Sequence, residues 1–241
     1  MSGPRIHIDA PLEPGGELIL PEGAARHIVT VLRQREGAAL VLFDGRGHEA
    51  AAELVEVGRK RVVACVNTVS PGRGESPLKV HLGQAISKGD RMDYAIQKAV
   101  ELGVAVITPL YTEHGDVRLK GEREAKKHTH WRGVAISACE QCGRATLPTI
   151  HPPRSLGDWL SEREEPLRLV LHPATQSPWK ESRDVNEAAL LIGPEGGLAE
   201  EEVIRARHAG FTALSLGPRV LRTETAPVVA LSLLQHYFGD L

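Results

Sequence analysis

Near its C-terminus the chain contains Ile192-Gly193-Pro194-Glu195-Gly196-Gly197 and then Leu216-Gly217-Pro218-Arg219-Val220-Leu221-Arg222-Thr223-Glu224-Thr225-Ala226-Pro227. Each segment follows an apolar run that is typical of a buried strand, residues 188–192 for the first and 211–216 for the second. Each also leads toward a helical pattern, and α/β proteins commonly bind ligands between a strand and the helix that follows it. Glycines there let backbone N–H groups approach a ligand closely, because no Cβ intervenes. The two loops therefore predict one shared small-molecule site.

The surrounding sequence extends this alternation of strands and helices. Strands are expected at residues 79–86, 104–110, 167–172, 188–192 and 211–216. Helices are expected at residues 90–102, about 122–142, about 200–209 and about 226–238. The alternation predicts a mainly parallel sheet with helices on both faces.

The N-terminal part has a different pattern, with short strands separated by turn signals. Strands are expected at residues 16–20, 39–43, 49–55 and 62–69, with one helix at about 22–32. This pattern predicts a small β-barrel or sandwich. Residues 70–77 are rich in Pro, Gly and Ser and read as a linker. We therefore expect a first domain at 1–72 and a second at 73–241.

Composition limits the class of protein. The formal net charge is −2, from 29 basic and 31 acidic residues, so nucleic-acid binding would have to depend on local clusters. No apolar stretch approaches the roughly 20 residues that span a bilayer, and the N-terminus lacks a signal-peptide pattern. These features predict a soluble, cytoplasmic protein that binds no membrane.

Two of the three cysteines form a C-x-x-C motif, Cys139 and Cys142, with His128 and His130 upstream. A metal or redox site is one interpretation of this motif. The pair lies late in a helical pattern, however, where positions i and i+3 share a face. Ordinary helix packing is therefore favoured, and we expect no metal.

The glycine loops differ from the standard nucleotide-binding motifs. The chain has neither G-x-x-x-x-G-K-[ST] nor a G-x-G-x-x-G between a first strand and its helix. Pro194 and Glu195 stand where a phosphate cradle would present bare N–H groups. A neutral or cationic ligand is therefore favoured. Glu195 and Glu224 suit a positive centre, although a carboxylate beside a glycine turn also caps helices.

The G-P-E-G-G loop followed by L-G-x-R-x-L-R-T-E-T-A resembles the SPOUT-class RNA methyltransferases, specifically the bacterial 16S ribosomal RNA uridine-N3 methyltransferase family. Residues 27–33, 97–103 and 140–144 resemble further motifs of that family, so the resemblance covers essentially the whole chain. It implies an α/β fold: a C-terminal SPOUT trefoil-knot methyltransferase domain with an N-terminal PUA-like β-barrel that helps to hold RNA. It also implies a homodimer. Two departures are Cys142, where many relatives have serine, and Ala199, where a helix N-cap is often Ser or Thr.

In this family the knotted loops bind S-adenosyl-L-methionine, mostly through the main chain. Carried over by position, the implied cofactor-binding residues are Leu171, His172, Gly193, Pro194, Glu195, Gly196, Gly197, Leu216, Gly217, Val220, Leu221, Thr223 and Thr225.

The implied reaction is methylation of N3 of a specific uridine in 16S rRNA, free or in the small ribosomal subunit. Arg222 is the first candidate for stabilising negative charge on the uracil, since arginine stays protonated. Glu224 is the nearest candidate base; its alternative role is to fix Arg222 or a loop amide, with solvent hydroxide as the alternative acceptor of the proton. Candidate phosphate contacts in the RNA are Arg5, Arg26, Arg33, Lys88, Arg91 and Arg144. A ribose 2′-O-methyltransferase and a non-catalytic RNA-binding assembly factor are the alternative functions.

Overall fold

The computed structural model of the chain describes residues 3–58, 61–72, 75–172 and 185–241. It divides into two compact units. The first contains Met1–Glu75 with Cys139–Leu147, and the second contains Ser76–Ala138 with Pro148–Leu241. Residues 73 and 74 of the expected linker lie outside the described residues. The domain boundary expected after residue 72 stays a prediction.

The first unit is a curled five-stranded sheet with the order β1-β3-β4-β5-β2. Its strands are β1 (Arg5–His7), β2 (Glu17–Ile19), β3 (Ala39–Phe43), β4 (His48–Val57) and β5 (Val62–Pro71). Strand β4 alternates strictly over its middle: Ala50, Ala52 and Leu54 are buried, while the residues between them are exposed. That period of two gives the sheet one apolar face, which forms the core of the unit with the buried Ile28.

The helix expected at about 22–32 has two parts. Helix α1 (Glu22–Arg26) continues into a wider π-helical turn, η1 (His27–Val31). In that turn the N–H of Leu32 donates to the carbonyl of His27, at 3.0 Å. Arg33 follows with a φ of 51°, an uncommon backbone conformation for a residue with a side chain.

The second unit contains a seven-stranded sheet in which every paired strand is parallel. Its order is β12-β10-β11-β6-β7-β8, and β9 pairs with β7. The strands are β6 (Lys79–Ala85), β7 (Val106–Tyr111), β8 (Thr149–Ile150), β9 (Arg154–Ser155), β10 (Leu167–Leu171), β11 (Glu187–Ile192) and β12 (Thr212–Leu214). The predicted parallel sheet is thus confirmed.

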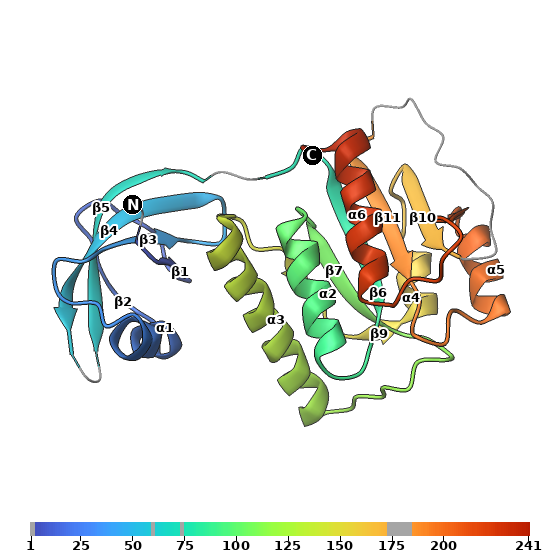
Figure 1. Ribbon diagram of the computed structural model, residues 1–241, viewed down its shortest axis with the longest axis horizontal. Helices are drawn as coiled ribbons and strands as arrows, with labels where there is room; N and C mark the ends of the chain where they lie inside the picture. The colour runs from blue at the N-terminus through green and yellow to red at the C-terminus, as the bar shows by residue number, and fades with distance from the viewer. Residues whose placement is uncertain (1–2, 59–60, 73–74, 173–184) are drawn as a thin grey trace. The chain divides into compact units, whose positions relative to one another are not determined.

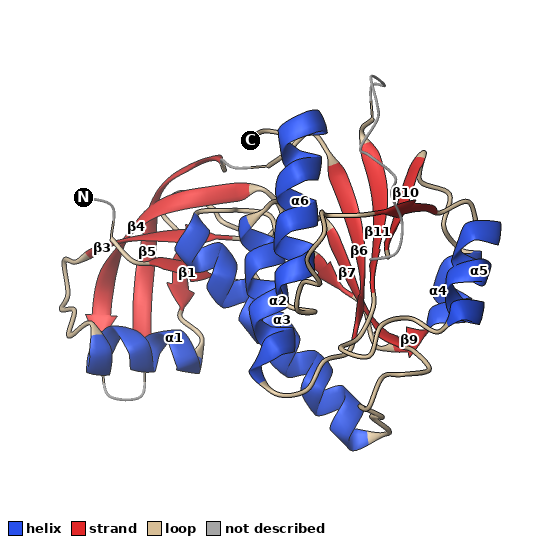
Figure 2. Cartoon of the chain, turned by 45° about the vertical axis from the view of Figure 1, so that its right-hand side comes forward, coloured by secondary structure: helices blue, strands red, loops and turns tan. Residues whose placement is uncertain are grey.

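Helices cover both faces of this sheet, as expected (Figures 1 and 2). Helices α2 (Asp90–Glu101) and α6 (Thr225–Phe238) pack on one another, while α4 (Leu156–Ser161) and α5 (Glu200–His208) pack together on the opposite face. Both faces of β11 are buried, because Ala188 through Ile192 are all apolar. No helix in the described part of the chain, α3 (Glu122–Cys142) included, is long and apolar enough to cross a membrane.

Three neighbouring strands place the two glycine loops at one edge of the sheet. Strands β10, β11 and β12 are adjacent and parallel, so their carboxyl ends lie side by side. The segment after β11 contains the first glycine loop, and the segment after β12 contains the second. The sequence-based expectation of one shared site therefore has a structural basis.

Candidate functional site

A cavity of about 630 Å³ lies beyond the carboxyl ends of β10, β11 and β12. Both glycine loops line it, together with Leu171 and His172 at the end of β10. All of the residues predicted to bind the cofactor line this cavity except Gly196 and Thr225. A Cβ on Gly196 would lie 3.2 Å from the Cβ of His114, and Thr225 is the first residue of α6. Arg222 and Glu224, the predicted catalytic pair, also line the cavity.

The backbone of the loops depends on glycine at two of its turns. Gly197 has a φ of 76° and Gly217 a φ of 100°, a region that residues with a Cβ rarely adopt. The N–H of Gly197 donates to the carbonyl of Pro194 at 2.9 Å and so closes the first loop as a tight turn.

A buried hydroxyl connects the two loops. Thr223 is 5% exposed, and its Oγ1 donates to the carbonyl of Gly193 at 2.9 Å. The second loop is therefore fixed to the start of the first by a direct hydrogen bond. The residue that follows, Glu224, precedes α6, and Pro227 occupies the first turn of that helix, where a missing N–H does no harm.

Charged side chains of both signs meet on the cavity wall. Arg91, at the start of α2, donates to Oε1 of Glu195 at 2.8 Å, and this hydrogen bond raises the pKa of Arg91. The charge of Glu224 acts on Arg91 in the same direction. One oxygen of Glu224, Oε2, is buried without a hydrogen-bond partner in the described part of the chain. An anionic oxygen in that position suits a cationic ligand.

The side chains predicted to contact RNA phosphates differ in how exposed they are and in the ion pairs that they already form. Arg26 is exposed and forms a weak ion pair with Glu22 at 3.5 Å, and Arg33, further along the chain, is also exposed. Lys88 is exposed and pairs with Asp116 at 2.6 Å. Arg91 is exposed, lines the cavity and pairs with Glu195, and its assignment as a phosphate contact stays a prediction.

Two of the residues predicted to contact phosphate, Arg5 and Arg144, form ion pairs with other residues of the first unit. Arg144 is 4% exposed, and its guanidinium donates to both carboxylate oxygens of Glu75. Arg5 pairs with Glu49 at 2.8 Å and also donates to the carbonyl of Arg144. Burial and these bonds occupy the guanidinium of Arg144, which leaves little of it exposed to a phosphate, and its assignment as an RNA contact stays a prediction.

The C-x-x-C motif has the environment of a packed helix. Burial raises the pKa of the Cys139 thiol to about 12, and this thiol lies 3.8 Å from the carbonyl of Thr146, to which it donates. A thiol that stays protonated is neither a good metal ligand nor a good nucleophile. Over the residues that the structure describes, no three His, Cys, Asp or Glu side chains are grouped to hold a metal ion.

Sequence reasoning missed the contribution of the β6–α2 junction to this site. Arg91 reaches the cavity from the start of α2, and Gln84 and Ser87 contact Thr223 from β6 and the segment after it. This junction also contains a glycine at a strand-to-helix turn, Gly89, with a φ of 60°. That glycine was the available signal, because it marks the same kind of junction as the two loops.

Comparison with known proteins identifies both units. Residues 74–235 match the RNA methyltransferase domain family, and residues 20–64 match the RNA methyltransferase PUA domain family. A methyltransferase from Legionella pneumophila, solved in complex with the cofactor SAM, is 45% identical over 100% of both chains with a TM-score of 0.97. The matches confirm the predicted fold class, an α/β SPOUT methyltransferase domain with an N-terminal PUA domain.

Relatives of assigned activity match over nearly the whole chain. Ribosomal RNA small subunit methyltransferase E of Buchnera aphidicola (subspecies Schizaphis graminum) is 36% identical over 99% of this chain and 98% of its own length. The enzyme of the same name from Neisseria gonorrhoeae, solved bound to S-adenosyl methionine, is 37% identical over 99% of both chains with a TM-score of 0.92. The chain therefore belongs to the ribosomal RNA small subunit methyltransferase E family.

Proposed function

We propose that the protein transfers a methyl group from S-adenosyl-L-methionine to N3 of a specific uridine in 16S rRNA. The observation that carries this proposal is the cavity itself, because its lining brings together both glycine loops, Arg222 and Glu224. The two relatives solved with this cofactor match the whole chain, which supports the choice of cofactor.

The residues of the cavity fit that cofactor. A volume of about 630 Å³ lies in the range of roughly 300–1,000 Å³ that small-molecule sites occupy. Leu171, Ile192 and Leu214 give it apolar walls, and the glycine turns expose backbone. The buried, unpaired oxygen of Glu224 offers an anionic partner to a ligand of positive charge. We propose that the loops at 193–197 and 216–225, with Leu171 and His172, hold the cofactor.

When bound, S-adenosyl-L-methionine supplies an electrophilic methyl group on a sulfonium. The uracil N3 becomes nucleophilic only after it loses its proton, which leaves negative charge on the ring and its oxygens. We assign the stabilisation of that charge to Arg222, whose side chain makes no hydrogen bond in the described part of the chain. Glu224 is the nearest candidate to accept the proton, because it follows Arg222 by two positions and lines the same cavity.

The proposed substrate restricts how the RNA is presented. N3 lies on the Watson–Crick edge, so the target base must be unpaired while it reacts. We assign the surrounding phosphate contacts to the exposed Arg26, Arg33 and Lys88. We further propose that the protein acts as a homodimer without a metal, in the cytoplasm, on 16S rRNA or the assembled small subunit.

Primer extension on 16S rRNA tests the proposal. Small subunits from cells that lack the gene are incubated with the pure protein and the cofactor, and reverse transcriptase should then arrest at one uridine, because N3 methylation blocks base pairing. Reactions without cofactor are the control. A pause that appears only at low nucleotide concentration would instead indicate ribose 2′-O methylation. Binding without any arrest, on free RNA and on subunits alike, would indicate a non-catalytic assembly factor.

A further inference from the structure

The hydroxyl of Thr223 is a fully occupied hydrogen-bonding centre beside the cavity. It donates to the carbonyl of Gly193 at 2.9 Å, and it lies 3.3 Å from Nε2 of Gln84 and 3.4 Å from Oγ of Ser87. A hydroxyl has one hydrogen and two lone pairs. Because its hydrogen goes to Gly193, both Gln84 and Ser87 must donate to it. All three bonding positions of this buried oxygen are then filled.

Gln84 approaches Thr223 from the interior of the sheet. It lies on β6, is 0% exposed, and also donates through Nε2 to the carbonyl of Ala85 at 3.3 Å. Both partners of Nε2 are acceptors, which fixes the orientation of the amide. Its other end, Oε1, is buried without a hydrogen-bond partner among the residues that the structure describes.

An unpaired buried oxygen lowers stability, and an apolar side chain would fill the same space without that cost. Packing alone therefore does not account for an amide at position 84. What the amide adds is the bond from its nitrogen to Thr223, which orients the hydroxyl toward Gly193. Gln84 is not one of the residues that line the cavity, and Thr223 is the lining residue that its side-chain amide contacts.

We infer that Gln84 is a positioning residue for cofactor binding: through the hydroxyl of Thr223 it holds the second glycine loop against the carbonyl of Gly193. The first and second loops then keep one relative arrangement before the ligand arrives, and pre-organised sites bind more tightly because less ordering is left to do. The inference rests on the proposed function, since the ligand that benefits is S-adenosyl-L-methionine.

A double-mutant cycle tests this inference. Gln84→Met removes the amide at similar volume, Thr223→Val removes the hydroxyl, and the Kd for S-adenosyl-L-methionine is measured by titration calorimetry on both single variants and the double variant. Each single change should raise the Kd by about tenfold, the size expected for one buried hydrogen bond. The double variant should be no weaker than Thr223→Val alone, because Gln84 has lost the group through which it acts. With the cofactor saturating, kcat of Gln84→Met should change by less than about threefold.

Gln235 provides the matched control. It is also a 0% exposed glutamine, and it donates to the carbonyl of Leu102 and accepts from Ser76. Gln235→Met should lower the melting temperature and leave the Kd unchanged. If Gln84→Met does not fold, Gln84→Asn keeps the amide but shortens its reach, and it should raise the Kd in the same way.

Three results would overturn the inference. They are an unchanged Kd in Gln84→Met or Gln84→Asn, fully additive effects in the double variant, and an equal rise in Kd for Gln235→Met. These results leave the proposed function intact provided that the unaltered protein binds the cofactor. If the unaltered protein does not bind it, the proposed function fails, and the inference fails with it.

Discussion

Arg222 combines an exposed guanidinium with a place on the cavity wall, and its side chain has no hydrogen-bond partner in the described part of the chain. Its backbone has a separate role, because its carbonyl accepts from the N–H groups of Thr225 and Ala226, both at 2.9 Å. These hydrogen bonds at the start of α6 involve only the backbone of Arg222, so truncating its side chain should leave them in place. The effect of Arg222 on the reaction can therefore be measured apart from folding.

Arg222→Ala should lower kcat by about 100-fold, the usual consequence of removing one charge-stabilising donor, while the Kd for the cofactor changes by less than about twofold. Radiolabelled methyl transfer to small subunits and calorimetry measure the two quantities. Arg207, exposed on α5 and outside the cavity, is the control, and Arg207→Ala should leave both unchanged. A loss of cofactor affinity as large as the loss of kcat would assign Arg222 to cofactor binding instead.

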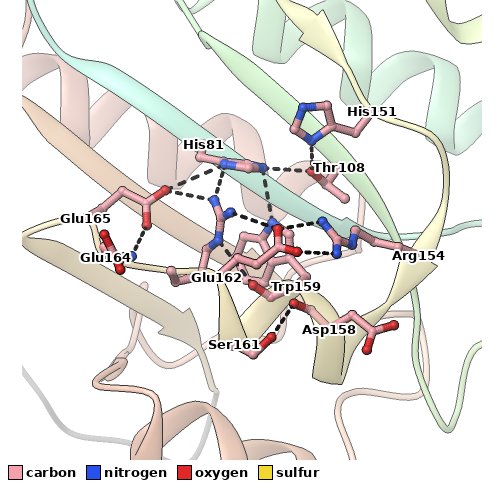
Figure 3. A network of polar contacts seen from close by, with 11 residues as sticks. His81, Thr108, His151, Arg154, Asp158, Trp159, Ser161, Glu162, Glu164 and Glu165 are labelled. Carbon is pink, nitrogen blue, oxygen red and sulfur yellow. Dashed lines mark hydrogen bonds and ion pairs between the residues drawn. The ribbon is translucent and has the colours of Figure 1, made fainter.

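His81 is a buried histidine in a polar network away from the cavity (Figure 3). The indole N–H of Trp159 donates to its Nε2 at 3.1 Å. Its Nδ1 faces the guanidinium of Arg163 and Oε1 of Glu165, the latter at 3.6 Å. Burial lowers the pKa of His81, and the positive charge of Arg163 adds to this effect, while the hydrogen bond and the charge of Glu165 act in the opposite direction and are outweighed.

Stability should therefore fall as the pH drops below the unfolded-state pKa of His81, about 6.5. Above that pH the ring is neutral in both states and contributes no pH dependence. Below it the unfolded chain binds the proton more readily, which favours unfolding by up to about 1.4 kcal/mol per pH unit for each such group. His151 on the same network adds to this slope, because burial lowers its pKa as well.

Urea unfolding from pH 7.5 to pH 5 measures this slope, and His81→Gln should make it shallower. The titration of Glu165 does not contribute to the slope between pH 7.5 and pH 5. Burial would raise its pKa, but the hydrogen bond to His81 and the charge of Arg163 outweigh burial and lower the pKa to about 2, so its contribution is lost only below pH 4.5. His208→Gln, at an exposed position of α5, is the control. Identical slopes in His81→Gln and the unaltered protein would exclude His81 as the source.

Among the elements, helix α5 carries half of a capping box. Its N3 residue, Glu202, is 2% exposed and accepts from the N–H of Ala199 at 3.0 Å, whereas the N-cap residue Ala199 has no acceptor to return the bond. Glu202 also accepts from the N–H of Glu113 at 2.9 Å. Within the described part of the chain, the side chain that caps the N-terminus of α5 is therefore the carboxylate of Glu202.

Ala199→Ser should complete the box and raise the free energy of unfolding by about 1 kcal/mol. Urea denaturation gives the value directly. Ala199→Val adds bulk without an acceptor at this 5% exposed position and should give no gain. Equal changes in the two variants would show that volume, not capping, decides stability at position 199.

The elements also show what the sequence can and cannot predict. The helix expected at about 122–142 is α3 (Glu122–Cys142), because a long run provides many helical turns of pattern. The six-residue α4 (Leu156–Ser161) was not expected, since so short a run shows little periodicity, although Ser155 caps it by accepting from the N–H of Asp158. Likewise β1 (Arg5–His7) is too short to show alternation.

The candidate site was also predictable from the sequence only in part. The glycine loops were predictable because glycine at a strand end has a local conformational meaning. The pairing of Arg91 with Glu195 was not, because the two residues are 104 positions apart in the sequence. The order of the strands, which brings β10, β11 and β12 together, could not be predicted from periodicity either. An alternating pattern shows which face of a strand is buried, but not which strands lie next to each other.

For the whole molecule, a net charge of −2 means that long-range attraction to RNA is weak. Binding must then depend on where the 29 basic residues lie rather than on how many there are. Arg26 and Arg33 are exposed on and just after the helical segment of the first unit, and within the described part of the chain their only ion pair is the long contact from Arg26 to Glu22. Neither side chain therefore has to give up a strong ion pair before it contacts a phosphate.

The paired variant Arg26→Glu/Arg33→Glu should weaken RNA binding and make the logarithmic dependence of affinity on salt shallower by up to about 1.4, about 0.7 for each phosphate contact to a single strand. The control is Arg205→Glu/Arg207→Glu on α5, which changes the net charge by the same amount at exposed positions. Fluorescence anisotropy over a salt series measures both. If affinity depends on net charge alone, the two variants lose it equally. If Arg26 and Arg33 contact phosphate, only the first variant changes the slope, because only that variant removes cations that displace counterions from the RNA.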